Sequence, residues 1–492
     1  ISILPNDLPL TTAYVDSLQN LGLQIRNLSK WFNAVTVESY DTALLDTITQ
    51  LSFVAGKEKV MKFRHSSIGV LSPLNSEKRS EGFSGVKSYY NYGPAAHQVE
   101  MLNGHQLHDL GYRGEGMQIA VIDAGFSNAD VHPVFDSIWQ NGQVLGCRDF
   151  VDQDTFVLGH HNHGMNVLSI MAANLGGMMV GTAPKASYWL LRSEDTDSEY
   201  RVEEDNWIAA AEFADSIGAD IITTSLGYNT FDDTCQNYTY EDLDGNTARI
   251  TIGADIAASK GILVVASAGN DGSTSWHYIN FPADGDSVMA VGAVSSDSAY
   301  ASLSSTGPTS DGRIKPNVMA QGKSTYVAIS DTGYYNGSGT SFAAPIISGL
   351  AACLWQAHPE LTNIQLMEVI EESADQYFSP DSLKGYGLPD FYQAHLILRI
   401  LKEQNIHNSD LAIVYPNPFT DRIEIDFYSV DSQEVKIELF DLMGRMIYSN
   451  EQPVFPGIRN QLDITGLSSV RQGVYVLRIR ADEKAFKYKL IK

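Results

Sequence analysis

Between residues 96 and 402, short and almost continuously apolar runs alternate with segments of helical periodicity, and this pattern constrains the fold more than any other feature. The runs at 118–122, 220–224 and 262–266 lack the alternation of half-buried strands, so both faces of each strand are expected to be buried. Helical patterns, such as the one at 207–217, separate the runs. The sequence therefore predicts a three-layer α/β domain with a parallel sheet.

The residues before this domain have a different pattern. Residues 1–65 combine helix-like and strand-like stretches, with a strand expected at 30–37 and an amphipathic helix at 41–51. Residues 66–95 are rich in serine, glycine and charge, which is typical of an exposed linker. We therefore expect a small α+β unit joined to the central domain by this linker.

The pattern changes again after residue 402. A short polar linker is expected at 403–411, and beyond it apolar and polar residues alternate strictly in three short runs: 422–427, 435–439 and 474–479. Turn residues separate these runs. Alternation at such close spacing predicts a C-terminal β-sandwich over 412–492.

Length and composition limit the classes of protein to consider. A chain of 492 residues with 43% hydrophobic and 19% charged residues is long enough for several globular domains, each with its own core. The formal net charge of −26 argues against general binding of nucleic acid, which requires a cationic surface. The three cysteines of the chain form no CxxC pair, which argues against a cysteine zinc cluster. The apolar run at 341–355 is too short to cross a bilayer, so no transmembrane helix is expected.

Two polar segments follow apolar runs at positions where chemistry is common. Asp123 ends the run at 118–122 and precedes Gly125, and the carboxyl edge of an open α/β sheet is where ligands bind. Asp123 could equally cap the turn. His160, His161 and His163 stand just before an apolar helical stretch and could bind a metal, supply a base or lie in a solvated loop; no HExxH spacing accompanies them.

Two further segments are built from small residues. Ser341 lies in the run GTSFAAP at 339–345, at the start of a long apolar helix. A serine there can cap the helix or act as a nucleophile, because first-turn amides favour developing negative charge. Asn270 follows the strand-like run at 262–266 and could be a turn residue or a donor to an oxyanion.

Together these four residues, in the order Asp, His, Asn, Ser, point to one family. The chain resembles the subtilisin-like serine peptidases over about residues 96–402. The resemblance rests on VIDAG at 121–125, HGMNV at 163–167, GTAPKA at 181–186, TSLG at 224–227, SAGN at 267–270, GTSFAAP at 339–345 and GYGLPD at 385–390. The family usually has Thr-His where this chain has Met165-Asn166, which leaves the triad intact but changes the packing beneath the base.

The resemblance implies a mechanism. Ser341 would attack the scissile carbonyl, His163 would accept its proton and return it to the leaving amine, and Asp123 would hold the imidazole. The Asn270 side chain and the Ser341 backbone N–H would form the oxyanion hole. No cofactor is required for this chemistry. Structural calcium is common in the family, and residues 242–246 offer oxygen ligands without a full EF-hand pattern.

The resemblance also implies a substrate cleft. Its first pocket would be lined by five residues, Ser225, Leu226, Gly227, Ala268 and Gly269, with Asp271 at the rim. The acidic segment 194–205 would lie at the cleft edge. It is either a solvated loop or the source of a preference for lysine or arginine near the scissile bond.

The flanking units resemble known modules as well. KWFNAV at 30–35 resembles the subtilase propeptides, which assist folding and inhibit until they are removed. VYPNP at 414–418, DLMG at 441–444, GVYV at 473–476 and the basic end at 487–492 resemble the sorting domain of type IX secretion cargo. This implies that the bacterial secretion machinery is a partner and that the protein is exported across the outer membrane.

The function expected from these patterns is that of a secreted serine endopeptidase acting on protein or peptide substrates. The alternative from another class is an inactive surface adhesin on the same scaffold, and a third is a metallohydrolase that uses the histidine cluster. An adhesin has no use for all four of Asp123, His163, Asn270 and Ser341, so their joint presence favours the peptidase.

Overall fold

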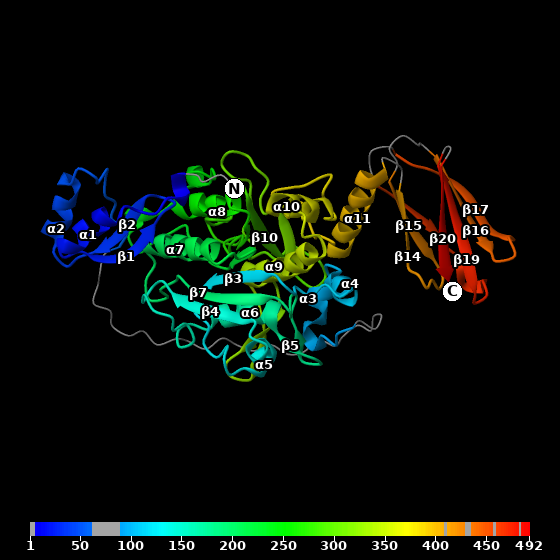
Figure 1. The fold of residues 1–492 in the computed structure, drawn as a ribbon, viewed down its shortest axis with the longest axis horizontal. Helices are drawn as coiled ribbons and strands as arrows, with labels where there is room; N and C mark the ends of the chain where they lie inside the picture. Colours follow the sequence, from blue (N-terminus) through cyan, green and yellow to red (C-terminus); the bar gives the residue numbers. More distant parts are fainter. Residues whose placement is uncertain (1–4, 62–88, 408–410, 429–433, 456–458, 482–483) are drawn as a thin grey trace. The chain divides into compact units, whose positions relative to one another are not determined.

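The computed structural model describes residues 5–61, 89–407, 411–428, 434–455, 459–481 and 484–492. The chain divides into two compact units, Ile1–Ala394 and His395–Lys492, which are described separately (Figure 1). Most of the linker expected at 66–95 lies outside the described residues.

A parallel sheet forms the centre of the first unit. Its strands, in sheet order, are β11 (Val318–Gln321), β10 (Val288–Val294), β9 (Leu263–Ser267), β8 (Ile221–Thr224), β3 (Gln118–Asp123), β7 (Ser187–Arg192) and β4 (Val144–Asp149). All residues of β8, β9 and β10 are buried, and so are five of the six in β3. The apolar runs therefore form doubly covered strands, as predicted.

Helices cover both faces of this sheet, which gives the three layers expected from the sequence. On one face α6 (His163–Ala172) packs against α9 (Thr340–Ala357), and on the other α7 (Val202–Ser216) packs against α8 (Arg249–Ser259) (Figure 1). A large hydrophobic core lies between the sheet and α7 and α8, where Trp207 is fully buried.

Shorter elements complete the domain and are not part of the main sheet. They are α3 (Ala96–Glu100), α4 (Gly104–Asp109), α5 (Asp136–Gln140), α10 (Asn363–Glu372) and the hairpins β5–β6 (Asn174–Leu175, Met179–Val180) and β12–β13 (Thr325–Ile329, Gly333–Gly337). Helix α9 is apolar and long enough to cross a membrane, but 89% of its 18-residue window is buried inside the structure. It is thus a core helix of this unit.

The parallel sheet brings distant residues together at one edge. Strands β9, β8 and β3 are neighbours, and their carboxyl ends carry Asn270, Ser225 and Asp123. Because parallel strands end at the same edge, these three segments lie side by side.

The N-terminal part contains α1 (Thr12–Asn20), β1 (Gln24–Ser29), β2 (Ala34–Glu38) and α2 (Thr42–Thr47). The single strand expected at 30–37 is wrong, because the chain turns at 30–33 and Asn33 takes a positive φ of 47°. The two strands pair as an antiparallel hairpin around this turn. The helix expected at 41–51 is present as α2 and a following 3₁₀ turn, with the Asp41 carboxylate capping its first amides.

The hairpin is attached to α7 of the central domain. The Glu212 carboxylate on α7 accepts hydrogen bonds from Ser29 Oγ at 2.5 Å, Lys30 N at 3.0 Å and Trp31 N at 3.2 Å. Asp205, also on α7, accepts a hydrogen bond from Thr36 Oγ1 at 2.8 Å. Two carboxylates of one helix therefore hold the turn and the second strand of the hairpin.

The second unit contains two antiparallel sheets, which agrees with the predicted β-sandwich. One sheet has the order β14 (Leu411–Tyr415), β15 (Ile423–Tyr428) and β18 (Arg459–Ile464); the other has β17 (Met446–Pro453), β16 (Glu434–Asp441), β19 (Val474–Ala481) and β20 (Lys484–Ile491). The helix α11 (Phe391–His407) extends into the segment 403–411, which was expected to be a linker. Residues 403–407 are therefore helical.

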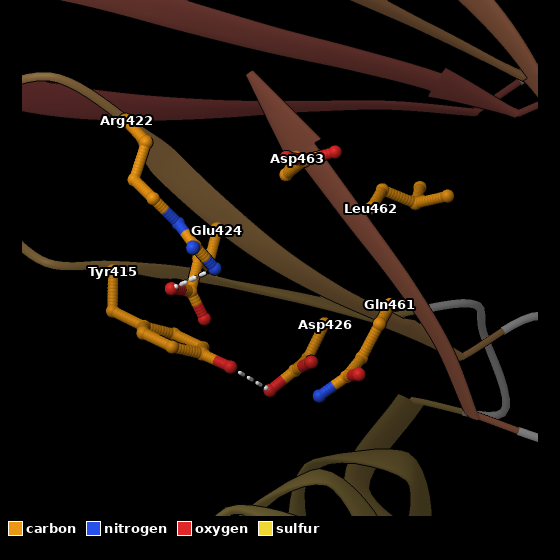
Figure 2. Close-up of a pocket in the computed structure, with 7 residues that line it drawn as sticks. All are labelled: Tyr415, Arg422, Glu424, Asp426, Gln461, Leu462 and Asp463. Atoms are coloured by element: carbon orange, nitrogen blue, oxygen red, sulfur yellow. Dashed lines mark hydrogen bonds and ion pairs between the residues drawn. The ribbon is translucent and has the colours of Figure 1, made fainter. Parts of the chain in front are cut away.

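A shallow polar pocket lies on the three-stranded sheet of this unit. Figure 2 shows Tyr415 donating a hydrogen bond to Asp426 at 2.9 Å, and Arg422 paired with Glu424. Four of the polar side chains that line this pocket thus bind one another in two pairs.

Candidate active site

The carboxylate of Asp123 and the ring of His163 are joined directly. His163 Nδ1 lies 2.7 Å from Asp123 Oδ1, and the same oxygen accepts a hydrogen bond from the Ala124 backbone N–H at 2.7 Å. Asp123 is fully buried at the end of β3, whereas the His163 side chain is 25% exposed at the start of α6. A buried carboxylate thus orients an imidazole whose other nitrogen is left for chemistry.

Glycine makes this close approach possible. A Cβ at Gly164 would lie 2.6 Å from the Gly125 carbonyl oxygen and 3.0 Å from Asp123 Cβ. Any larger residue after His163 would therefore push α6 away from the end of β3.

The residues that depart from the family pattern have structural roles. Met165 is fully buried, and Asn166 Nδ2 donates a hydrogen bond to the Ala328 carbonyl oxygen on β12. Ser169 Oγ accepts a hydrogen bond from the Ala328 N–H at 3.1 Å. The α6 helix beneath the base is thus held by the β12–β13 hairpin.

The protonation of His163 is governed by two opposing effects. Burial lowers its pKa, but the charge of Asp123 and the hydrogen bond to it outweigh burial, with a smaller contribution from Glu194. The net result is a pKa raised above the ordinary 6.5. A raised pKa makes the ring a stronger base toward a serine hydroxyl.

Ser341 lies in the first turn of α9 and is 8% exposed. Its hydroxyl donates to the Ser225 carbonyl oxygen at 3.3 Å, and the Ser225 hydroxyl donates to the Ser341 carbonyl oxygen at 2.9 Å. No hydrogen bond joins Ser341 to His163 within the described part of the chain, although the ring of the next residue, Phe342, lies 6.2 Å from the His163 ring. Hydrogen bonds between nucleophile and base are often long before substrate binds.

Asn270 is exposed, and its side-chain amide is oriented by the start of the same helix. Its Oδ1 accepts hydrogen bonds from the Thr340 backbone N–H at 2.8 Å and the Thr340 hydroxyl at 3.1 Å. This arrangement leaves the Nδ2 group as a donor. The Ser341 N–H lies in the first helical turn, where backbone donors lack acceptors within the helix.

A polar pocket of about 430 Å³ lies beside these segments. It is lined by Glu199, Gly227, Asn229, Thr230, Phe231, Asp232, Asp271 and Asn280. Gly227 is the only residue of the expected pocket set to line it; Ser225, Leu226, Ala268 and Gly269 do not.

Asn280 was missed in the sequence, and it explains where the pocket forms. A Cβ at Gly227 would lie 3.0 Å from Asn280 Cβ, and a Cβ at Gly269 would lie 2.9 Å from Asn280 Cγ. Asn280 Nδ2 donates to Asp271 Oδ2 at 2.9 Å. The segments around Gly227 and Gly269 thus leave room for the Asn280 side chain between them. No local sequence pattern around Asn280 indicated this position.

The acidic segment 194–205 differs from the solvated loop considered above. Residues 196 and 197 are exposed, but Glu203 and Glu204 are fully buried and Asp205 is 6% exposed. Glu204 accepts a hydrogen bond from Tyr238, and Asp205 pairs with Arg249 at 2.8 Å. The description as a solvated loop is therefore wrong for the first turn of α7.

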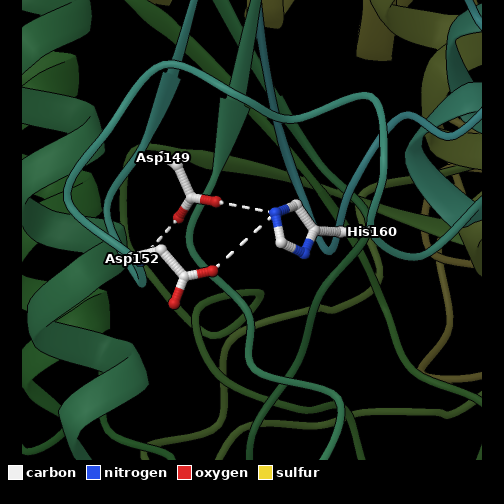
Figure 3. Close-up of side chains that lie close together, drawn as sticks. All are labelled: Asp149, Asp152 and His160. Atoms are coloured by element: carbon white, nitrogen blue, oxygen red, sulfur yellow. Dashed lines mark hydrogen bonds and ion pairs between the residues drawn. The ribbon is translucent and has the colours of Figure 1, made fainter.

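The histidine cluster is divided between two sites. Figure 3 shows His160 pointing toward Asp149 and Asp152, at 3.4 and 3.7 Å from their carboxylates. His163 instead forms the pair with Asp123. The Arg192 guanidinium reaches both of these carboxylates at 2.7 Å. A basic side chain of the protein thus supplies the positive charge there.

The loop considered for calcium, residues 242–246, uses its carboxylates locally. Asp242 accepts hydrogen bonds from the N–H and hydroxyl of Thr239, and Asp244 accepts from the backbone N–H groups of Asn246 and Thr247. These contacts close the loop on itself.

Comparison with known proteins identifies the families that match each part of the chain. The subtilase family profile matches residues 114–387, the profile of the peptidase S8 propeptide domain of Bacteroidota matches 1–78, and that of a secretion system C-terminal sorting domain matches 413–492. The first unit therefore combines a propeptide with a serine endopeptidase domain. The sorting domain indicates export by type IX secretion to the cell surface or outside the cell.

Relatives of known activity cover the same region. Subtilisin E of Bacillus subtilis (strain 168) is 33% identical over 294 residues, which is 59% of this chain and 68% of that protein. A thermophilic serine proteinase of Bacillus sp. (strain AK1) is 32% identical over 308 residues, 62% of this chain and 67% of that protein. The MycP3 protease of a type VII secretion system has the same fold, with a TM-score of 0.50, 20% identity and coverage of 62% of this chain and 91% of that one. The chain belongs to the subtilase family.

Proposed function

We propose that this protein hydrolyses peptide bonds with Asp123, His163 and Ser341 as a catalytic triad, and with Asn270 and the Ser341 N–H as the oxyanion hole. The observation that carries the proposal is the 2.7 Å contact between His163 Nδ1 and the buried Asp123 carboxylate, beside helix α9, whose first turn contains Ser341. Intact Ser341 and Asn270 at this edge favour an enzyme over an inactive adhesin.

The reaction follows from these positions. His163 Nε2 takes the proton of Ser341 Oγ as that oxygen attacks the substrate carbonyl, and Asp123 stabilises the imidazolium that forms. The proton then passes to the leaving amine, and water later releases the acyl group by the same route. The hydroxyl must leave its 3.3 Å contact with Ser225 O to reach the base, and we expect it to do so by rotating to another staggered side-chain conformation.

The oxyanion hole acts on charge that develops during the attack. Asn270 Oδ1 is bound to Thr340, so Nδ2 is held as a donor before substrate arrives. Donors fixed in advance need no reorganisation in the transition state, which is why they are effective.

The pocket supports a substrate class. The carboxylates of Asp232 and Asp271 line it, together with the carboxyl group of Glu199, whose pKa burial raises to about 8, and it contains no basic side chain. We therefore expect a preference for lysine or arginine beside the scissile bond, because a cationic side chain gains charge-assisted hydrogen bonds there.

Peptide-library cleavage tests both activity and preference. The processed enzyme should cut after or near basic residues, and Asp271→Asn should lower kcat/KM for these sites about 10-fold, the effect of one hydrogen bond to a charged group. Sites with uncharged residues should change little. High salt should reduce the preference of the unmodified enzyme for basic over uncharged sites, since the pocket is open to solvent and its charges are screened. Equal cleavage of basic and neutral sites by the unmodified enzyme would rule out the substrate class, while absence of all cleavage would rule out the peptidase.

A further inference from the structure

Three glutamates from one stretch of chain bring their carboxylates together outside the triad. Glu194 follows β7, Glu199 lies in the next loop and Glu203 is in the first turn of α7. One carboxylate oxygen from each lies within 4.8 Å of the others. Like charges at this distance repel strongly unless something compensates for them.

Glu203 is the member that lacks compensation. It is fully buried, and neither of its carboxylate oxygens makes a hydrogen bond of normal geometry, the Asp195 backbone N–H having only a minor influence. Its neighbours Glu204 and Asp205, which are almost as buried, have Tyr238 and Arg249 as partners. A buried carboxylate without a partner is costly, so this one requires a ligand or a proton.

The acidic cluster around Asp149 shows how the chain solves the same problem elsewhere. There the Arg192 guanidinium reaches the carboxylates of Asp149 and Asp152, both at 2.7 Å. Across the described residues, no lysine, arginine or histidine forms an ion pair with Glu194, Glu199 or Glu203. Within the described part of the chain, the only side chain that donates a hydrogen bond to any of the three is the Tyr228 hydroxyl, 2.6 Å from Glu194 Oε2.

Burial and mutual repulsion change the protonation of the cluster. Burial raises the pKa of Glu194 to about 7 and that of Glu199 to about 8, and the neighbouring carboxylates add to both shifts. The pKa of Glu203 is raised further for the same two reasons. Without a cation, these groups therefore hold protons that free glutamates would have lost at neutral pH, and a bound cation would replace those protons.

We propose that Glu194, Glu199 and Glu203 bind one Ca²⁺ ion. Calcium takes six to eight oxygen ligands at about 2.3–2.6 Å, so a single ion can contact three oxygens that lie within 4.8 Å of one another. Backbone carbonyls or water would complete its shell. Zinc prefers nitrogen or sulfur, which the cluster lacks, and Mg²⁺ requires a smaller and more regular shell.

The ion would connect the segment beside the triad to the wall of the substrate pocket. Ser193, just before Glu194, donates its backbone N–H to the Asp123 carbonyl oxygen at 3.1 Å. Glu199 lines the pocket, and Tyr228, which binds Glu194, follows the pocket residue Gly227. Calcium at this cluster would therefore hold residues 194–203 in place and stabilise the catalytic unit. An exported protein can use a site of modest affinity for this purpose.

Thermal unfolding of the full-length Ser341→Ala chain tests the proposal, because this variant removes self-digestion as a complication. After treatment with a chelator at alkaline pH, addition of Ca²⁺ at about 5 mM should raise the unfolding temperature by about 5 °C, as a ligand that binds only the folded state does. Mg²⁺ should raise it less. Adding Glu203→Gln should abolish the calcium shift, and Glu199→Gln should reduce it strongly.

Direct binding and a matched control locate the site. Tb³⁺ luminescence excited through tyrosine should appear in the parent chain, because Tyr228 contacts the cluster, and Ca²⁺ should displace Tb³⁺ and quench the luminescence. The luminescence should be lost in Glu203→Gln. If that variant does not fold, Glu199→Gln should show a strongly reduced luminescence instead. Asp244→Asn, in the loop 242–246, should leave the calcium shift unchanged. The proposal is overturned if Ca²⁺ has no effect on the parent chain, if both glutamine variants keep the full shift, or if the shift is lost in Asp244→Asn instead.

Discussion

Replacing Ser341 by alanine should lower kcat by about 10⁶-fold, the order of magnitude expected when the nucleophile of a triad is removed. The side chain is 8% exposed at the start of α9, and alanine fits a helix there without strain, so the fold should survive. The remaining rate would come from binding and the oxyanion hole, which do not depend on the hydroxyl. The measurement is hydrolysis of a chromogenic peptide by the purified proteins.

A control separates chemistry from structure in this experiment. Ser225→Ala removes the hydroxyl that donates to the Ser341 carbonyl oxygen, and it lies at the same edge of the sheet. It should retain most of the activity, because its hydroxyl takes no part in proton transfer. A Ser341→Ala protein that keeps more than about one per cent of kcat would show that another residue attacks the substrate.

Replacing Asn270 by alanine should lower kcat about 10²–10³-fold and leave KM nearly unchanged, the typical cost of one oxyanion donor. The amide acts on the charge that appears in the transition state, so substrate binding does not use it. Its loss also leaves the Thr340 N–H without its 2.8 Å acceptor, and the unfolding temperature should therefore be measured alongside.

Whether the substitution of Asn270 changes kcat or KM decides the role of this residue. Asn229→Ala is the matched control, since Asn229 donates to Asn280 at 3.0 Å in the pocket and should act mainly through KM. If Asn270→Ala instead raises KM with kcat unchanged, Asn270 belongs to ground-state binding and the oxyanion hole must be built from other donors.

The central sheet could be predicted from the sequence because its strands are buried on both faces. Runs such as 118–122 and 262–266 have no other structural explanation at that length, and they became β3 and β9. Asp123 and Asn270 could be placed near each other because parallel strands end at one edge. The alternating runs of the C-terminal unit were equally informative, since one face of each strand is buried.

Features that depend on contacts between distant segments could not be predicted. The run 30–37 contains five aromatic or β-branched residues, which favour a strand, and the turn at its start depends on the positive φ that Asn33 adopts. Asn280 enters the pocket because two glycines far apart in sequence leave room for it. Glu203 is a charged residue in an acidic stretch, a composition typical of an exposed surface, and its burial follows from the position of α7 against the sheet.

The most direct test of the triad is covalent labelling of the processed protein with a fluorophosphonate, followed by peptide mass spectrometry. The probe reacts with a serine only where a neighbouring base has activated it. The geometry predicts a single adduct on Ser341 that appears in step with loss of peptidase activity and is absent from the His163→Ala protein. Peptide hydrolysis that continues while Ser341 stays unlabelled, or an adduct on a different residue, would contradict the assignment.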